Sequence, residues 1–394
     1  MRALEKTTAI TGVGQSQLGR RLNRTGLELT VESTMRAIAD AGLKPSDIDG
    51  ICCWPGRNEH SLGMGPTSAM EMKEALGLNL NWYFAGSEGP AQMSSVMMAS
   101  MAVASGLARH VLVFRTLIEA TMQTPERRAS QQAPVNGRIT GPYSWMMPYN
   151  APSAANWLAM VAQRRFHEFG LTREQMAQVA LNGRRNAQLN PDAVMRGPLT
   201  LDDYMSSRMI TTPLCLFDCD IPMDGSIAVI VSHVDDAKDM PQTPVRIEAM
   251  SATLHDRFSW DQREDLTSMA SNDAGARLWE RTDFKPKDVD IAELYDGFSV
   301  LSLIWLESLG FCGRGESGAF VEGGKRIALD GELPLNTHGG QLSAGRMHGF
   351  GYIQEAVLQL RGQAGERQVK NDPKVAVVAN GGGPLAACML LARD

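Results

Sequence analysis

Residues 336–353 form a glycine-rich stretch that carries three polar side chains able to act on a ligand, His338, Arg346 and His348. Glycines permit positive φ angles and close approach of the backbone to a ligand. Histidine and arginine supply hydrogen-bond donors, and histidine can also exchange a proton near neutral pH. This composition is typical of a binding loop, but solvated loops often share it, so the stretch alone favours a solvated connection.

Two further glycine-bearing stretches favour a function. Residues 292–299 follow a strand-like run and contain Tyr295, and residues 377–384 place three glycines between apolar runs. A tyrosine hydroxyl has a pKa of about 10, so it exchanges protons near neutral pH only if a nearby cation lowers that value. Arg346 is the candidate cation. A buried aromatic with a bonded hydroxyl is the alternative role for Tyr295.

A third region combines an expected sharp turn with a buried helix. Residues 92–107 contain no charged side chain, which indicates a helix without a solvent-facing side. Pro90 suits the first turn of that helix, and Ser87 can cap its free amides. Enzymes direct nucleophiles from such turns. No Gly-x-Ser-x-Gly pattern surrounds Ser87, so we favour the capping role.

A short phrase occurs twice in the chain. Residues 44–49 read Lys-Pro-Ser-Asp-Ile-Asp, and residues 285–290 read Lys-Pro-Lys-Asp-Val-Asp. Each copy follows a helix-like segment and precedes an apolar strand-like run. The repeat predicts a duplicated α/β unit in which helices cover a mixed sheet.

Composition excludes several classes of protein. With 43% hydrophobic residues and 21% charged residues, the 394-residue chain is predicted to be globular. A net charge of −6 gives no basic surface for nucleic acid. The first residues lack a signal-peptide pattern and no apolar run reaches transmembrane length, so we expect a cytoplasmic protein. The six cysteines show no zinc-site spacing, so we predict no structural metal, and we expect no disulfides.

The pattern Asn-Thr-x-Gly-Gly-x-Leu-Ser-x-Gly-x-x-His-Gly from Asn336, with residues 292–299 and 377–384, resembles the C-terminal half of the thiolase superfamily. The nearest branch is that of sterol-carrier-protein thiolase domains and lipid-transfer-protein-type steroid side-chain aldolases. The resemblance covers nearly the whole chain. It implies an α/β thiolase-like fold with two duplicated halves, residues 1–240 and 241–394. Their mixed five-stranded sheets would sandwich buried helices, with a loop domain inserted at about residues 118–220.

The resemblance also implies that ordinary thiolase chemistry is lost. The positions of the two essential cysteines are occupied by Gly86 and Ala379, and the two remaining thiolytic positions by Arg346 and Tyr295. The aldolases share the Glu-Leu-Tyr-Asp-x-Phe motif of residues 293–298. They carry a second tyrosine where this chain has Arg346.

The first hypothesis is therefore an acyl-CoA aldolase, a carbon-carbon lyase that cleaves a β-hydroxyacyl-CoA side chain from a steroid-like carrier. A short acyl-CoA and a ketone or aldehyde would leave. Tyr295 would exchange the hydroxyl proton, and Arg346 or His348 would polarise the thioester oxygen. His338 is the further candidate on the glycine loop. CoA is substrate here, with no cofactor and no metal, and its thioester would contact the residues Gly340, Ser343, Gly382 and Gly383.

Two alternatives stay open. The chain could be a catalytically degenerate subunit that binds acyl-CoA or supports a partner, or an acyltransferase that uses Ser87. The resemblance implies a homodimer formed through residues 81–85. It also implies a small partner with an oligosaccharide-binding-type fold and a zinc ribbon, giving a heterotetramer with zinc only in the partner. The loop domain offers five arginines as candidate phosphate partners for CoA, although a solvated helix face is the favoured role for each one singly: Arg164, Arg165, Arg184, Arg185 and Arg208.

Overall fold

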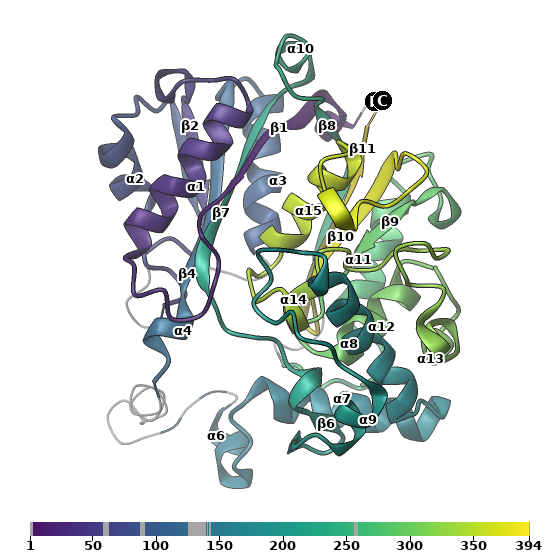
Figure 1. Ribbon diagram of the computed structural model, residues 1–394. Coiled ribbons are helices and arrows are strands. Elements are labelled where there is room, and N and C mark those ends of the chain that lie inside the picture. The colour runs from purple at the N-terminus through teal and green to yellow at the C-terminus, as the bar shows by residue number, and fades with distance from the viewer. Residues whose placement is uncertain are drawn as a thin grey trace.

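The computed structural model describes residues 3–57, 63–86, 91–124, 139, 141, 143–255 and 259–393. Within them, nine strands form one mixed sheet in the order β3-β2-β4-β7-β1-β8-β11-β10-β9, and β5 and β6 pair separately (Figure 1). The strands are β1 Thr8–Gln15, β2 Gly50–Cys53, β3 Trp82–Ala85, β4 His110–Ile118, β5 Met209–Thr211, β6 Leu214–Cys215, β7 Asp224–His233, β8 Val245–Leu254, β9 Ile291–Glu293, β10 Val375–Gly382 and β11 Leu385–Ala392.

Helices cover both faces of this sheet. The α-helices are α1 Gly26–Asp40, α2 Ala69–Leu76, α3 Ala91–Ala104, α4 Glu119–Met122, α6 Tyr143–Met146, α7 Ala154–Phe169, α8 Arg173–Gln188, α9 Leu201–Ser206, α10 Val234–Ala237, α11 Ala270–Trp279, α12 Ser299–Ser308, α13 Ser317–Val321, α14 Gly340–Ser343 and α15 Phe350–Leu360. The short 3-10 helices are η1 Leu4–Thr7, η2 Pro45–Asp47, η4 Met147–Tyr149, η5 Leu216–Asp218, η6 Pro286–Asp288, η7 Glu322–Gly324 and η8 Gly365–Arg367.

The strands are apolar on both faces, and alternate residues enter different cores. On β4, Val111 and Val113 join a central core together with residues of α3 and α15. Leu112 and Phe114 join an outer core with α1 and α2. Strands β10 and β11 divide their residues in the same way between the central core and a second outer core. Period-two burial therefore builds the predicted layers, with α3 and α15 between the two parts of the sheet (Figure 1).

The two predicted five-stranded sheets differ from the observed sheet in two respects. The halves join edge to edge, because Ala9 and Ile10 of β1 pair with Arg246 and Val245 of β8. The second half contributes four strands, and in place of a fifth the chain makes a single parallel bridge between Leu335 and Ala292. The division at residue 240 falls in the connection between α10 and β8 and stays a prediction.

The repeated phrase adopts the same structure in both places. The Asp47 side chain accepts a hydrogen bond from the Lys44 N–H, and Asp288 accepts one from Lys285, each at 2.8 Å. The last aspartate of each phrase then binds two backbone N–H groups of a following chain segment: Asp49 those of Arg109 and His110, and Asp290 those of Lys374 and Val375. Each phrase thus joins the start of one parallel strand to the start of its neighbour, as a duplication predicts.

Helix burial is more varied than the sequence indicated. Helix α15 is almost entirely buried, as is α12. Helix α3 was predicted to be buried on all sides, which is wrong: Met98 and Met101 are each 38% exposed. The absence of charge on this helix therefore does not mean that all of it is covered. Ser87 and Pro90 lie outside the described residues, so the capping role stays a prediction.

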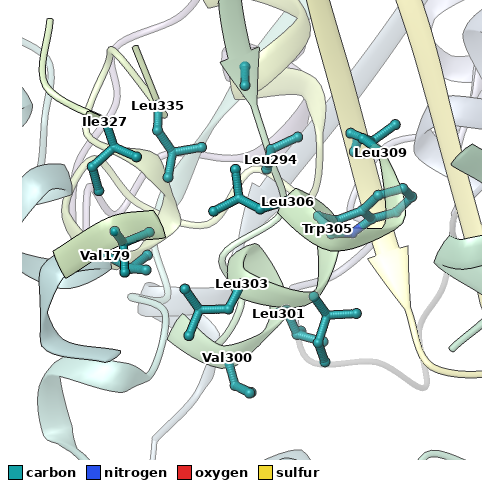
Figure 2. Packing of buried hydrophobic residues seen from close by; sticks show 14 of the residues in the cluster. Val179, Leu294, Val300, Leu301, Leu303, Trp305, Leu306, Leu309, Ile327 and Leu335 are labelled. Carbon is teal, nitrogen blue, oxygen red and sulfur yellow. The ribbon is translucent and has the colours of Figure 1, made fainter. Parts of the chain in front are cut away.

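Helix α12 anchors the segment that carries Tyr295. Figure 2 shows Leu301, Leu303 and Trp305 of this helix in the same apolar cluster as Val179 of α8. The Trp305 indole N–H donates to the Gly381 carbonyl at 3.0 Å, so the helix is also tied to the end of β10. Because α12 begins four residues after Tyr295, this packing limits the motion of the candidate site.

Within the described residues, no helix is both long enough and apolar enough to cross a membrane. No group of three or more histidine, cysteine or acidic side chains there is arranged to hold a metal ion. All six cysteines are unpaired.

Candidate active site

Arg346 lies at the centre of a buried charge cluster. Its Nε and Nη2 atoms donate to the two carboxylate oxygens of Glu119, each at 3.0 Å, and its Nη1 donates to Asp220 Oδ1 at 2.9 Å. The carboxylate side chains of Glu119 and Asp220 are only 2% and 10% exposed. Paired hydrogen bonds of this kind hold the planar guanidinium in one orientation.

Backbone hydrogen bonds place this cluster beside Tyr295. The Asp220 N–H donates to the carbonyl of Gly297, two residues after Tyr295, at 3.2 Å. The next residue, Ile221, bonds to the glycine loop on its other side, donating to Gln341 O at 3.1 Å and accepting from the Arg346 N–H at 2.9 Å. The extended segment around Asp220 therefore joins the Tyr295 turn to the glycine loop.

The cluster shifts the proton affinities of its members. Burial raises the pKa of Asp220 to about 7, and the neighbouring charges of Glu119 and Asp296 add to this effect while Arg346 opposes it. Burial and then the charge of Asp220 raise the pKa of Tyr295 above its ordinary value, against the opposing effect of Arg346. Arg346 thus acts in the expected direction, but burial and the charge of Asp220 outweigh it, so the Tyr295 pKa is not lowered overall.

His348 is held from three sides. Its backbone has a φ of +47°, a left-handed conformation that is uncommon for a residue other than glycine. Its N–H donates to Gln341 Oε1 at 2.9 Å, and its ring nitrogen Nδ1 lies 3.0 Å from Nη2 of the buried Arg115. Burial, followed by the charges of Arg115 and Arg346, lowers the pKa of His348 well below its ordinary value. The ring is therefore neutral at physiological pH.

His338 belongs to a separate network. Its Nδ1 lies 3.0 Å from Glu293 Oε2, while Thr337 bridges Glu293 and Glu355 through its hydroxyl at 2.8 Å to each. Burial opposes a charged ring, but the hydrogen bond and charge of Glu293 outweigh burial and raise the pKa of His338. The network ties the glycine loop to β9 and α15, which indicates a structural role.

The residues predicted to contact the thioester lie in tightly packed places. Gly340 has a φ of +61°, and a Cβ atom there would overlap the carboxylate of Asp296. Ser343 Oγ accepts a hydrogen bond from Arg184 at 3.0 Å. A Cβ on Gly383 would overlap the ring of Trp260, and its N–H donates to Met269 Sδ at 3.0 Å. Each has a packing role in this structure.

Gly382 and the loop-domain arginines also have internal contacts. Gly382 has a φ of +145° and lies beside Leu301 and Met269. Arg165 is paired with Glu307, Arg164 with Glu168, and Arg185 donates to Asn182 and Gly324. Of the five arginines proposed as phosphate partners, Arg208 is exposed and its side chain has no hydrogen bond or ion pair with the described residues.

Sequence reasoning missed three members of the site: Glu119, Asp220 and Arg115. Arg346 is 227 and 126 residues away from the first two, so no local spacing connects them. Arg115 could have been recognised from the sequence, because it is the one arginine or lysine among the apolar and neutral residues of β4. A charged residue in a buried strand points to a specific partner.

This fold and site define a thiolase-superfamily protein without thiolase nucleophiles. Ala379 is buried on β10, at a position that has no nucleophilic atom, and Gly86 stands at the end of β3. The two remaining thiolytic positions hold Arg346 and Tyr295, and the carboxylates of Glu119 and Asp220 pair with the arginine. Such a site can move a proton and bind an oxyanion but cannot form an acyl-cysteine.

Comparison with known proteins supports this classification. The thiolase C-terminal domain-like family model matches residues 252–391. The chain is 34% identical to a steroid side-chain-cleaving aldolase of Thermomonospora curvata, over 99% of both chains. It is also 34% identical to the 17-hydroxy-3-oxo-4-pregnene-20-carboxyl-CoA lyase of Mycobacterium tuberculosis, over 98% of this chain and 100% of that one.

A solved structure agrees with these relatives. The Ltp2-ChsH2(DUF35) aldolase superimposes with a TM-score of 0.88 at 32% identity, covering 100% of this chain and 99% of that chain. The chain therefore belongs to the thiolase superfamily, in the family of these aldolases.

Proposed function

We propose that this protein is an acyl-CoA aldolase that cleaves the β-hydroxyacyl-CoA side chain of a steroid-like substrate by a retro-aldol reaction. The products are a short acyl-CoA and a ketone or aldehyde. The relatives named above are an aldolase and a lyase that match almost the full length of the chain. The observation that carries the proposal is the buried Glu119–Arg346–Asp220 cluster beside Tyr295, in a fold that has lost its nucleophiles.

In this mechanism the substrate hydroxyl gives its proton to the pair formed by Tyr295 and Asp220. Tyr295, protonated at neutral pH, accepts a hydrogen bond from the substrate hydroxyl and passes its own proton to Asp220 as it receives the new one. Asp220 accepts the proton, because a carboxylate with a pKa of about 7 can both take and return one near neutrality. The C–C bond breaks, and its electron pair forms the thioester enolate.

The enolate then needs stabilisation and a proton. A neutral N–H of His348 can donate to the enolate oxygen without giving up its proton. Asp220 returns the proton through Tyr295 to the enolate carbon, which completes the short acyl-CoA. Arg346 holds Asp220 in place and keeps part of its population ionised, so its role differs from the thioester contact that the sequence suggested.

Turnover of a synthetic β-hydroxyacyl-CoA tests this function. We expect release of free ketone or aldehyde together with a shorter acyl-CoA in equal amounts, measured by liquid chromatography. The Tyr295→Phe variant serves as the protein control, with strongly reduced cleavage expected. The same substrate without its β-hydroxyl serves as the substrate control, with no cleavage expected. Tight binding of the substrate without cleavage would favour the degenerate-subunit alternative.

We also propose that the working form is a cytoplasmic assembly of at least two chains. Strand β3 lies at the edge of the sheet, and Tyr83 on it is 75% exposed. An exposed apolar edge is a ready pairing surface for a second copy. The name of the Ltp2-ChsH2(DUF35) aldolase includes a second component, which supports a partner for this chain, and we propose that the two form a heterotetramer. Full steady-state activity of the isolated chain would count against a required partner.

A further inference from the structure

Arg115 is an unusual residue for its surroundings. It lies in the middle of β4 with an exposed fraction of 1%, and no described carboxylate forms an ion pair with it. Burial lowers the pKa of Arg115 to about 9, so the guanidinium keeps its charge near neutral pH. The charge of Glu119 opposes this effect of burial only in part, and a buried cation without a direct ion pair is costly, which indicates that its hydrogen bonds serve a purpose.

Those hydrogen bonds hold the guanidinium through its two terminal nitrogens, while Nε has no partner among the described residues. Nη1 donates to the backbone carbonyls of Trp54, Met64 and Thr116, and the guanidinium carbon lies 4.7 Å from the centre of the Trp54 ring. Nη2 is then directed at Nδ1 of His348, 3.0 Å away. The Trp54 ring also lies edge-on to His348, with ring centres 6.4 Å apart. The two side chains are therefore held against each other by the same aromatic residue.

The direction of the Arg115–His348 hydrogen bond follows from chemistry alone. An arginine guanidinium only donates, so Nδ1 of His348 must be the acceptor and cannot carry a proton. A neutral imidazole has one proton, which then resides on Nε2. No described residue accepts a hydrogen bond from Nε2. His348 thus has a free N–H donor whose position is set by Arg115, Trp54 and Gln341.

Gln341 connects this donor to the rest of the site. Its Oε1 accepts from the His348 backbone, while its Nε2, fully buried, has no hydrogen-bond partner among the described residues. The Gln341 side chain also lies close enough to Tyr295 to favour the ionised phenol, lowering the Tyr295 pKa against the larger effect of burial. The Gln341 amide therefore lies beside the phenol, and the His348 N–H belongs to the same hydrogen-bonded part of the glycine loop.

We infer that Arg115 is a positioning residue that holds His348 as the Nε2–H tautomer, so that His348 and Gln341 together donate to the oxygen of the thioester enolate. This inference rests on the proposed aldolase function for its catalytic part and on geometry alone for the tautomer. The ligand chemistry is a thioester carbonyl that becomes an enolate oxygen. No proton leaves His348 during the cycle, and Arg115 does not touch the substrate.

The tautomer is tested by NMR of the full chain labelled with ¹⁵N-histidine, which needs no turnover. The His348→Gln variant identifies the His348 signals among those of the seven histidines. We expect an unprotonated Nδ1 and a protonated Nε2 that do not change between about pH 6 and 8. A charged ring, or a proton on Nδ1, in the wild-type spectrum would overturn the inference. This measurement decides the question even if variants of Arg115 do not fold.

The catalytic part is tested with Arg115→Met, which keeps a long side chain and removes every donor. We expect mixed tautomers of His348 in this variant, and a His348 pKa that rises relative to the wild type but stays below its ordinary value because burial and Arg346 still lower it. We expect kcat to fall on the order of 10- to 100-fold, as for other residues that orient a functional histidine, with little change in KM. Arg115→Lys, which restores one donor, should recover part of kcat.

Arg109→Met is the matched control, because Arg109 directly precedes the same strand but is exposed and pairs with Asp236. Unchanged kcat and an unchanged tautomer in Arg115→Met would overturn the positioning role. If the wild-type spectrum shows the Nε2–H tautomer but no β-hydroxyacyl-CoA is cleaved, the aldolase function fails while the Arg115–His348 contact stands. The two failures are therefore distinguishable.

Discussion

At the scale of single residues, the site pairs two carboxyl groups with the guanidinium of one arginine. Arg346 satisfies Glu119 with two hydrogen bonds and Asp220 with one. Burial raises the pKa of Asp220, which has the fewer hydrogen bonds to Arg346, to about 7. Asp220 is thus ready to gain or lose a proton at neutral pH, and Glu119 serves to orient the arginine.

Asp220 gives a pH-dependent prediction for activity. The group works as a base only when ionised, so kcat/KM should rise with pH through about 7 and then level off. Asp220→Asn should abolish this rise and lower kcat/KM on the order of 10²- to 10⁴-fold, the range of a general acid–base contribution. A pH profile of the wild type that stays flat between about pH 6 and 8 would contradict the assignment.

The same carboxyl group predicts an opposite effect on stability. Its folded-state pKa of about 7 lies above the ordinary value of 3.8, so the folded protein binds the extra proton over this range. The free energy of unfolding contributed by Asp220 is therefore lost as the pH rises through about 7. Asp220→Asn cannot ionise, so at pH 8 it should unfold at a temperature at least as high as that of the wild type. A clear loss of thermal stability at that pH would count against the raised pKa.

Tyr295 and Arg346 should respond differently to substitution. Tyr295→Phe removes one oxygen, so kcat should fall on the order of 10²- to 10⁴-fold with little change in thermal stability. Arg346→Met leaves two buried carboxylates without their ion-pair partner, so it should cost about 3–5 kcal/mol of stability besides activity. Calorimetry and turnover on both variants check this contrast. Cleavage at the wild-type rate by Tyr295→Phe would remove Tyr295 from the mechanism.

The sequence could predict the site residues that lie in recognisable motifs. It could not predict those that reach the site only when distant segments of the chain pack together. Tyr295, Arg346 and His348 follow from motifs in glycine-bearing stretches. Glu119 and Asp220 reach Arg346 only because α4 follows the end of β4 and residues 220–221 cross between two loops. The direction of the Tyr295 pKa shift could not be predicted either, since it depends on the burial of the phenol and on the nearby charge of Asp220, which outweigh Arg346.

At the scale of elements, the sequence was most informative where a local phrase repeats. The two Lys-Pro-x-Asp-x-Asp phrases fold alike because each carries its own capping aspartate and a second aspartate for the neighbouring strand. The missing fifth strand of the second half had no such local signal. At that position Leu335 makes a single β-bridge, and the chain then enters the glycine loop. The loop that carries the candidate site therefore takes the place of the fifth strand that the duplication predicts.

The second aspartate of each phrase gives a prediction for both copies. Asp49→Ala and Asp290→Ala each leave two strand N–H groups without an acceptor, so each should cost about 1–3 kcal/mol of stability. The costs should add in the double variant, because the two phrases lie in different parts of the sheet. Asp47→Ala and Asp288→Ala are the matched controls, with a smaller cost of about 1 kcal/mol for a lost cap. Urea unfolding of the six proteins measures these differences.

At the scale of the whole molecule, buried arginines join the two halves of the chain. Arg361, at the end of α15, donates to the Asp40 carboxylate and to the Thr11 carbonyl of the first half at 2.8 and 2.9 Å. Together with the central core, these contacts make the positions of β4 and the glycine loop interdependent. Arg115 belongs to one half of the chain and His348 to the other, so their contact requires β4 and the glycine loop to keep a fixed relative position.

Self-association is the prediction that belongs to this scale. An edge strand with exposed aromatic side chains favours pairing with a second copy, because its free N–H and C=O groups and apolar surface then become buried. Tyr83→Lys on β3 should therefore raise the dimer dissociation constant tenfold or more, as expected when an aromatic anchor is lost, with the wild type still dimeric at micromolar concentration. Tyr149→Lys is the matched control, because Tyr149 is 83% exposed and lies far from β3 in the sequence. Sedimentation equilibrium compares the three proteins. A wild type that is monomeric at micromolar concentration, or equal dissociation constants for the two variants, would show that β3 is not the contact surface.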